Sequence, residues 1–217
     1  MNEHRLSVPR SARYFTLGSP AREVWFVLHG YGQLAAPFLS QLASLDDGTR
    51  CLVAPEGLSR FYVDHRERQV GASWMTREDR LAEIDDYVRY LDAVYAGVFG
   101  RVRRDAVAVH VLGFSQGCAT AARWVAFGTA RADRLVLWGG EVPPDLELER
   151  AEVKARLARV DLTLVVGSDD RYITPKVVAR DTGRLAAAGI PHRVLSYHGD
   201  HRIDERVLRQ LTLPADA

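Results

Sequence analysis

The chain has 217 residues, a formal net charge of +1 and 47% hydrophobic residues. This length fits one domain with a sizeable core, and the near-neutral charge removes the electrostatic case for a nucleic-acid partner. No apolar stretch is long enough for stable membrane insertion, and two cysteines cannot build a disulfide scaffold. Because the first ten residues lack the apolar run of a signal peptide, we expect one cytoplasmic domain over residues 1–217.

Short apolar runs alternate with amphipathic stretches, a pattern typical of βα units around a parallel sheet. The predicted strands are Ala12–Leu17, Val24–His29, Arg50–Ala54, Ala106–Leu112, Arg134–Trp138, Leu162–Val166 and His192–Tyr197. The predicted helices are Ala36–Leu45, Arg77–Val98, Gln116–Phe127, Glu147–Arg159, Pro175–Ala188 and Asp204–Leu211. The sequence therefore predicts an α/β protein with a mostly parallel sheet of about seven strands and helices on both faces. The segment Gly57–Thr76 is predicted as a long irregular loop, a kind of segment that often carries function.

A Gly-x-Ser-x-Gly sequence joins the fourth predicted strand to the helix after it. Gly113-Phe114-Ser115-Gln116-Gly117 follows an apolar run and precedes small helix-forming residues. In a nucleophile elbow the serine stands on a turn so tight that neighbouring side chains must be nearly absent, and glycine meets that requirement. The pentapeptide predicts that Ser115 is a catalytic nucleophile, the alternative being a flexible loop rich in glycine and serine.

A nucleophilic serine needs a histidine as general base and a carboxylate that orients the histidine. Asp169 and Asp170 follow the strand predicted to end at Val166, and His198 and His201 follow the last predicted strand. The chain order serine, acid, histidine is that of α/β-hydrolases. The residues alone leave the choice within each pair open.

Further motifs make the likeness specific. They are His29-Gly30-Tyr31-Gly32, Gly140-Glu141-Val142-Pro143, Gly167-x-x-Asp170-x-x-Ile173 and Gly199-Asp200-His201. Together with the elbow, they resemble the phospholipase/carboxylesterase family of α/β-hydrolases, which includes the acyl-protein thioesterases, over nearly the whole chain. The resemblance implies an α/β-hydrolase fold without a large lid domain and a catalytic triad of Ser115, Asp170 and His201.

Acyl transfer also needs two backbone N–H donors, the oxyanion hole, for the charge that develops on the carbonyl oxygen. One donor comes from the residue after the nucleophile, here Gln116. The family's His-Gly-x-Gly pattern assigns the other to Tyr31, and His29 is expected to hold this loop by hydrogen bonds. Such a site needs no metal or cofactor, and the sequence shows no His/Cys cluster with zinc spacing.

The substrate-binding pocket is expected beside the long predicted helix. Trp74 resembles a family tryptophan at its rim, with core packing as the alternative, and Leu34, Tyr172 and Ile173 are expected to complete an apolar wall. Two departures from the thioesterase pattern bear on the substrate. Glu56-Gly57-Leu58 replaces an Asn-Gly-Gly-Met-type segment, and Trp74-Met75-Thr76 replaces Trp-Phe-Asp.

These features favour a carboxylesterase that cleaves small-molecule esters of short or medium acyl groups through an acyl-enzyme. A lysophospholipase or an acyl thioesterase with the same triad is the main alternative. A non-catalytic binding protein with this fold is a remote one. The sequence leaves the natural substrate and the oligomeric state open, a homodimer being one option.

Overall fold

The computed structural model describes residues 1–19, 22–100 and 102–212. Within these residues, a seven-stranded sheet runs in the order β1-β3-β2-β6-β7-β8-β9. All neighbouring strands are parallel except the pair of β1 and β3, so the predicted mostly parallel sheet is confirmed. The strands are β1 (Tyr14–Gly18), β2 (Glu23–Leu28), β3 (Arg50–Pro55), β6 (Ala108–Phe114), β7 (Arg134–Trp138), β8 (Asp161–Gly167) and β9 (Arg193–Tyr197).

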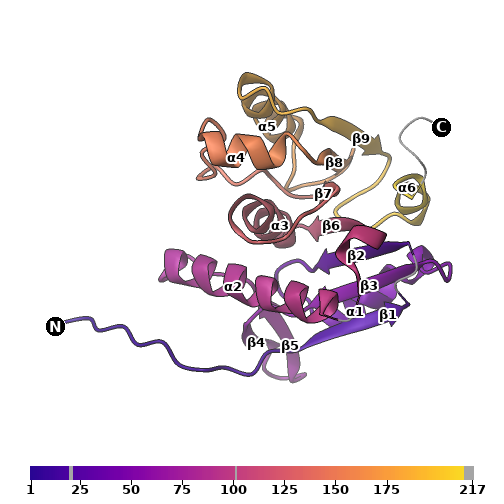
Figure 1. Ribbon diagram of the computed structural model, residues 1–217. Helices are drawn as coiled ribbons and strands as arrows, with labels where there is room; N and C mark the ends of the chain where they lie inside the picture. Colours follow the sequence, from indigo (N-terminus) through magenta and orange to yellow (C-terminus); the bar gives the residue numbers. More distant parts are fainter. Residues whose placement is uncertain (20–21, 101, 213–217) are drawn as a thin grey trace.

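Helices cover both faces of this sheet (Figure 1). One face carries α2 (Arg80–Phe99), α3 (Gln116–Phe127), α4 (Ala151–Leu157) and α5 (Pro175–Ala187). The other carries α1 (Ala35–Gln41), the short 3₁₀ helix η1 (Ala43–Leu45) and α6 (Glu205–Gln210). A further 3₁₀ turn, η2 (Arg104–Ala106), precedes β6.

Strand β2 is apolar from Val24 to Leu28 because both of its faces are covered. Val24, Phe26 and Leu28 pack into the core under α2 to α5, while Trp25 and Val27 pack into the core under α1 and α6. Successive side chains of a strand point to opposite faces, so a strand covered on both faces buries all of them. The two cores together fix the sheet whose carboxyl edge carries the site.

The segment Gly57–Thr76 corrects one prediction. In place of an irregular loop it contains an antiparallel hairpin of β4 (Ser59–Asp64) and β5 (Gln69–Ser73), separate from the main sheet. Gly32 N–H donates to Ala72 O at 2.9 Å, and Ala72 N–H donates to Gln33 O at 3.1 Å. The hairpin is therefore docked by its backbone on the loop that follows β2.

The predicted helices are confirmed, with some shorter ends. The helix predicted over Glu147–Arg159 is limited to α4, and the one predicted over Ala36–Leu45 divides at Leu42 into α1 and η1. Strand β7 and helix α3 have the predicted bounds. Across residues 1–19, 22–100 and 102–212, none of the helices combines the length and apolar character that crossing a membrane requires.

Candidate active site

Ser115 occupies a strained turn between β6 and α3. Its backbone has φ 53° and ψ −117°, which residues other than glycine rarely adopt. A β-carbon added at Gly113 would lie 2.3 Å from Gly117 O, and one added at Gly117 would lie 2.2 Å from Leu28 O. The two glycines thus permit a turn that no larger residue could make, and the backbone has the predicted geometry of a nucleophile elbow.

His201 and Asp170 form a hydrogen-bonded pair, with 2.7 Å between His201 Nδ1 and Asp170 Oδ2. The second carboxylate oxygen, Oδ1, accepts the backbone N–H groups of Tyr172 at 2.8 Å and Ile173 at 3.0 Å. Burial opposes ionisation of Asp170, but these two hydrogen bonds and that from His201 outweigh it and lower the pKa of the carboxyl. A carboxylate is therefore held beside the imidazole at neutral pH.

The two neighbouring candidates lie apart from this pair. His198 Nδ1 and Asp169 Oδ2 are 3.7 Å from each other at the surface, and the His198 side chain is 94% exposed. The His201 side chain is 19% exposed and packs between aromatic rings, with Phe114 at 5.0 Å and Tyr172 at 4.8 Å between ring centroids. The sequence left open the choice between the two aspartates and between the two histidines. The structure pairs Asp170 with His201, the two residues that the family resemblance implies.

Residues next to Ser115 in the sequence and in the sheet place the elbow close to His201. Phe114, which precedes the serine, is the residue that packs on His201, and Ser115 N–H donates to Trp138 O of β7 at 2.9 Å. A β-carbon added at Gly139, the residue that follows β7, would lie 3.2 Å from His201 Nδ1. Although both residues are described, no hydrogen bond joins Ser115 Oγ to His201. Catalytic hydrogen bonds of this kind are often long without substrate and tighten when it binds.

Two backbone N–H groups beside the serine have no acceptor. In the described ranges 1–19, 22–100 and 102–212, neither Tyr31 N–H nor Gln116 N–H donates a hydrogen bond. Gln116 opens α3, where backbone N–H groups lack partners within the helix and the positive end of the helix dipole lies. A β-carbon on Gly30 would lie 3.1 Å from Ser115 Cβ, so the loop that carries Tyr31 lies directly against the serine. Both expected oxyanion donors are therefore close to Ser115 and unpaired.

His29 holds this loop from beneath, as predicted. Its Nδ1 lies 2.8 Å from Gly30 O, and its Nε2 accepts the N–H of Gly57 at 3.0 Å. This hydrogen-bond pattern assigns the ring proton to Nδ1. Burial lowers the pKa of His29, so the neutral ring that both hydrogen bonds require is favoured.

Trp74 does not lie at a pocket rim, which corrects the predicted position. The indole is 1% exposed and packs 4.9 Å from the His29 ring, and its Nε1 donates to His29 O at 2.8 Å. The carboxamide of Gln116 binds the same segment, because Oε1 accepts Trp74 N–H at 3.1 Å and Nε2 donates to Met75 O at 2.8 Å. The segment that follows β5 therefore holds both the side chain of Gln116 and the backbone at His29, where the loop of Tyr31 begins.

The other residues expected in the apolar wall have different surroundings. Tyr172 is 70% exposed beside His201, Ile173 is buried, and Leu34 is half-buried just before α1. Phe61 of β4 lies 5.0 Å from the ring of Tyr31. Exposed aromatic rings thus flank the site on the hairpin side and on the histidine side.

Glu56 has a supporting role that sequence reasoning missed. Its side chain is 1% exposed, and it accepts hydrogen bonds from Arg13 Nε and Arg60 Nε, each at 2.7 Å, and from Ala35 N–H at 3.3 Å. It therefore ties the hairpin to the first residue of α1. Burial opposes ionisation of Glu56, but the hydrogen bonds from both arginines outweigh it and lower the pKa of its carboxyl.

We expect Glu56→Gln to lower the free energy of unfolding by about 1.5–3 kcal/mol at pH 7, the range for hydrogen bonds to charged groups. Because the folded-state pKa is lowered, this stabilisation is complete above the unfolded-chain value of about 4.3 and is lost as the pH falls through the folded-state value. Urea unfolding at pH 7 and about pH 4 should show a smaller difference at the lower pH. The exposed Glu149→Gln is the control, and a difference that stays constant with pH would refute this role for Glu56.

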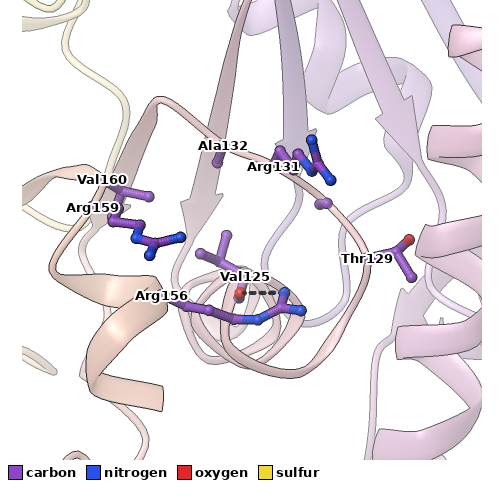
Figure 2. A pocket seen from close by; sticks show the side chains of 8 residues that line it. Val125, Thr129, Arg131, Ala132, Arg156, Arg159 and Val160 are labelled. Atoms are coloured by element: carbon purple, nitrogen blue, oxygen red, sulfur yellow. Dashed lines mark hydrogen bonds between the residues drawn. The ribbon is translucent and has the colours of Figure 1, made fainter. Parts of the chain in front are cut away.

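Two cavities lie at opposite ends of α3. The larger, about 690 Å³, surrounds the loop after α3 and is lined by Arg131, Arg156 and Arg159 (Figure 2). It borders Val125, about 15 Å from Ser115 at 1.5 Å per helical residue, and is therefore remote from the elbow. The smaller, about 260 Å³, is lined by Gln116 itself. Of these two cavities, the smaller is thus the one adjacent to Ser115.

The sequence matches no protein-family model and no curated protein. Solved structures, in contrast, match over nearly the whole chain. Acyl-protein thioesterase 2 of Zea mays has a TM-score of 0.72 and 19% identity, covering 93% of this chain and 98% of that one. Esterase PE8 has a TM-score of 0.69 and 21% identity, with coverage of 94% and 97%. SOBER1 of Arabidopsis thaliana has a TM-score of 0.68 and 18% identity, with coverage of 88% and 96%.

At this level of identity the likeness concerns the fold. The shared architecture is a mostly parallel sheet with helices on both faces, and the elbow lies between the fourth strand in the sheet order and the helix after it. No large lid domain stands over the sheet in the part of the chain that the structure describes. The chain therefore has the α/β-hydrolase fold.

Proposed function

We propose that this protein is a serine esterase of the phospholipase/carboxylesterase family that cleaves esters of short or medium acyl groups. The observation that carries the proposal is the 2.7 Å hydrogen bond between His201 and Asp170, packed against the elbow that presents Ser115. The fold supports it as well, because proteins named as esterases and thioesterases have the same architecture.

In the proposed reaction, Ser115 Oγ forms a bond to the ester carbonyl carbon while His201 Nε2 takes its proton. The carbonyl electrons move to the oxygen, which accepts hydrogen bonds from Tyr31 N–H and Gln116 N–H. Collapse of this intermediate breaks the bond to the alcohol oxygen, which takes the proton from His201. Water then attacks the acyl-enzyme with the same groups in the same roles, which releases the acid.

Asp170 orients the base throughout this cycle. Its Oδ2 receives Nδ1–H of His201, which leaves Nε2 free to accept the serine proton and stabilises the imidazolium that forms. The proposal includes a cytoplasmic location, since Cys51 and Cys118 are both free thiols in the core. An acyl thioesterase with the same machinery is the second candidate, supported by the name of the maize structure.

A chain-length series of p-nitrophenyl esters, from acetate to palmitate, tests the proposal. We expect the highest kcat/KM at eight carbons or fewer, and a butyryl thioester measured in parallel separates the ester from the thioester assignment. A maximum at palmitate would overturn the short-chain preference. Failure to hydrolyse any member would overturn the enzyme assignment and favour a non-catalytic binding protein.

The docking of the hairpin on the oxyanion loop makes a further prediction. A β-carbon on Gly71 of β5 would lie 2.3 Å from Gly32 O, so Gly71→Ala must push the hairpin and this loop apart. We expect kcat for p-nitrophenyl butyrate to fall by about 10²- to 10³-fold, as when one oxyanion donor is lost. Steady-state kinetics should show a smaller change in KM, because the donor acts mainly on the transition state.

Gly97→Ala is the matched control for this variant. Gly97 lies in α2, and a β-carbon there would meet nothing within 4 Å. The control should keep the wild-type kcat and gain stability, since alanine is the better helix former. A Gly71→Ala enzyme with unchanged kcat would show that the hairpin does not position the oxyanion loop.

A further inference from the structure

Two arginines line the cavity of about 260 Å³ next to Gln116. Arg80 of α2 and Arg123 of α3 both line it, together with Ala119 and Met75. Arg123 is 2% exposed, and arginine is almost never this buried unless it is paired. Its charge therefore needs a counter-charge within reach.

The two arginines share a single carboxylate oxygen. Asp145 Oδ1 accepts Arg123 Nη2 at 2.6 Å and Arg80 Nη2 at 2.7 Å. Hydrogen bonds from both guanidinium groups outweigh the burial of Asp145 and hold its pKa at about 2, so it supplies one full negative charge. Two cations facing one anion leave one positive charge without a partner.

Among the described residues that line the cavity, no other group balances this charge. Glu141 also lines it, but Glu141 Oε2 is 2.6 Å from Arg180 Nη2. The buried Asp181 contacts both Arg180 Nη2 at 2.8 Å and Arg184 Nη1 at 3.9 Å, so Arg180 and Arg184 together offset the charges of Glu141 and Asp181. Arg123 Nη1 donates to the neutral hydroxyl of Tyr87 at 3.2 Å, and Arg123 Nε is buried with no hydrogen-bond partner among residues 1–19, 22–100 and 102–212. An anion that enters the cavity would therefore be attracted by a positive charge that no carboxylate neutralises.

We infer that this cavity is a subsite for an anionic group of the substrate, and that the preferred substrates are esters that carry a carboxylate. The inference rests on the proposed esterase function and narrows its substrate class. Half-exposed Arg80 is the direct contact, because its guanidinium has further N–H donors and reaches solvent. Buried Arg123 supplies the uncompensated charge behind it.

The helix geometry sets the length of such a substrate. Ala119 is one turn and Arg123 two turns beyond Ser115, about 6 Å and 12 Å along the axis of α3. Helical side chains lean toward the N-terminus, which brings the guanidinium of Arg123 about one turn closer to the serine. A carboxylate about five or six carbons from the reacting carbonyl would therefore reach the cavity, if the charge lies on the acyl side.

Matched ester pairs test this inference and locate the charge. On the acyl side, p-nitrophenyl hydrogen adipate is compared with its methyl ester, which has the same chain without the charge. On the alcohol side, 4-carboxyphenyl butyrate is compared with 4-carbamoylphenyl butyrate. We expect kcat/KM for the charged member to exceed that of its neutral partner by about 10- to 100-fold in one of the two pairs, the range for charge-assisted hydrogen bonds.

Arg80→Gln should bring the ratio of kcat/KM between the charged and the neutral member of that pair to about one, and Arg80→Lys should retain part of the preference. Arg89→Gln is the control, since Arg89 is exposed on α2 and pairs with Asp86 at the surface. Equal rates for charged and neutral members in both pairs, or an Arg80→Gln enzyme that keeps the preference, would overturn the subsite. Absence of hydrolysis for every ester would instead overturn the proposed esterase function itself.

Discussion

Ser115→Ala is expected to lower kcat for p-nitrophenyl butyrate by about 10⁵- to 10⁶-fold. The hydroxyl oxygen is the only atom that forms the acyl-enzyme in the proposed reaction, so its loss leaves only the oxyanion donors and substrate binding. The strained backbone at this position belongs to the elbow and not to the side chain, so the variant should fold as the wild type does. Initial rates together with thermal unfolding of both proteins provide the measurement.

Ser168→Ala is the matched control for this prediction. Ser168 follows β8, next to the residues of the acid loop, and its hydroxyl lies 3.2 Å from the exposed His198. Because this serine is outside the elbow, its variant should keep full activity. A Ser115→Ala enzyme that retains activity within tenfold of the wild type would mean that hydrolysis uses another nucleophile.

Asp170→Asn is expected to lower kcat by about 10⁴-fold, the cost of a wrong imidazole tautomer. The side chain of asparagine has one acceptor oxygen. The backbone N–H groups of Tyr172 and Ile173 both donate to the Oδ1 position, so the amide oxygen must occupy it. The amide NH₂ then faces His201 Nδ1, which must accept a hydrogen bond and leave the proton on Nε2. An imidazole protonated at Nε2 cannot take the proton of Ser115.

The adjacent Asp169→Asn provides the control, since Asp169 is exposed and lies 3.7 Å from the exposed His198. Its kcat should equal that of the wild type. The residual activity of Asp170→Asn is measured as p-nitrophenol released over a long incubation. An equal fall in kcat for Asp169→Asn and Asp170→Asn would show that the negative charge of this loop, and not the hydrogen bond to His201, supports the reaction.

The sheet and the elbow could be predicted from the sequence because each depends on a local pattern. Strand β2 is apolar from Val24 to Leu28 since both faces are covered, and α3 begins at Gln116, directly after the serine of the Gly-x-Ser-x-Gly turn. The order of Ser115, Asp170 and His201 along the chain carries the triad hypothesis. The choice between Asp169 and Asp170 needed either the family pattern or the folded structure, because both follow the same strand.

The supporting parts of the site could not be predicted, because they depend on contacts between distant segments. Strand β4 mixes exposed and half-buried residues without buried ones, and the turn that joins it to β5 is charged, so the strand signal of the hairpin is weak. Trp74 has the same sequence signal whether its indole lines a pocket or, as here, packs under His29. Glu56 and Arg123 belong to residue types that are usually exposed, and only the fold supplies the partners that let them be buried.

The central claim is that Ser115 is an activated nucleophile, and covalent labelling with a fluorophosphonate tests it most directly. Intact-mass analysis followed by peptide mapping is predicted to find one adduct, on Ser115. That adduct should be absent from Ser115→Ala, formed at the wild-type rate in Ser168→Ala and formed much more slowly in Asp170→Asn. A wild-type protein that takes up no label, or that is labelled at a residue other than Ser115, would contradict the account.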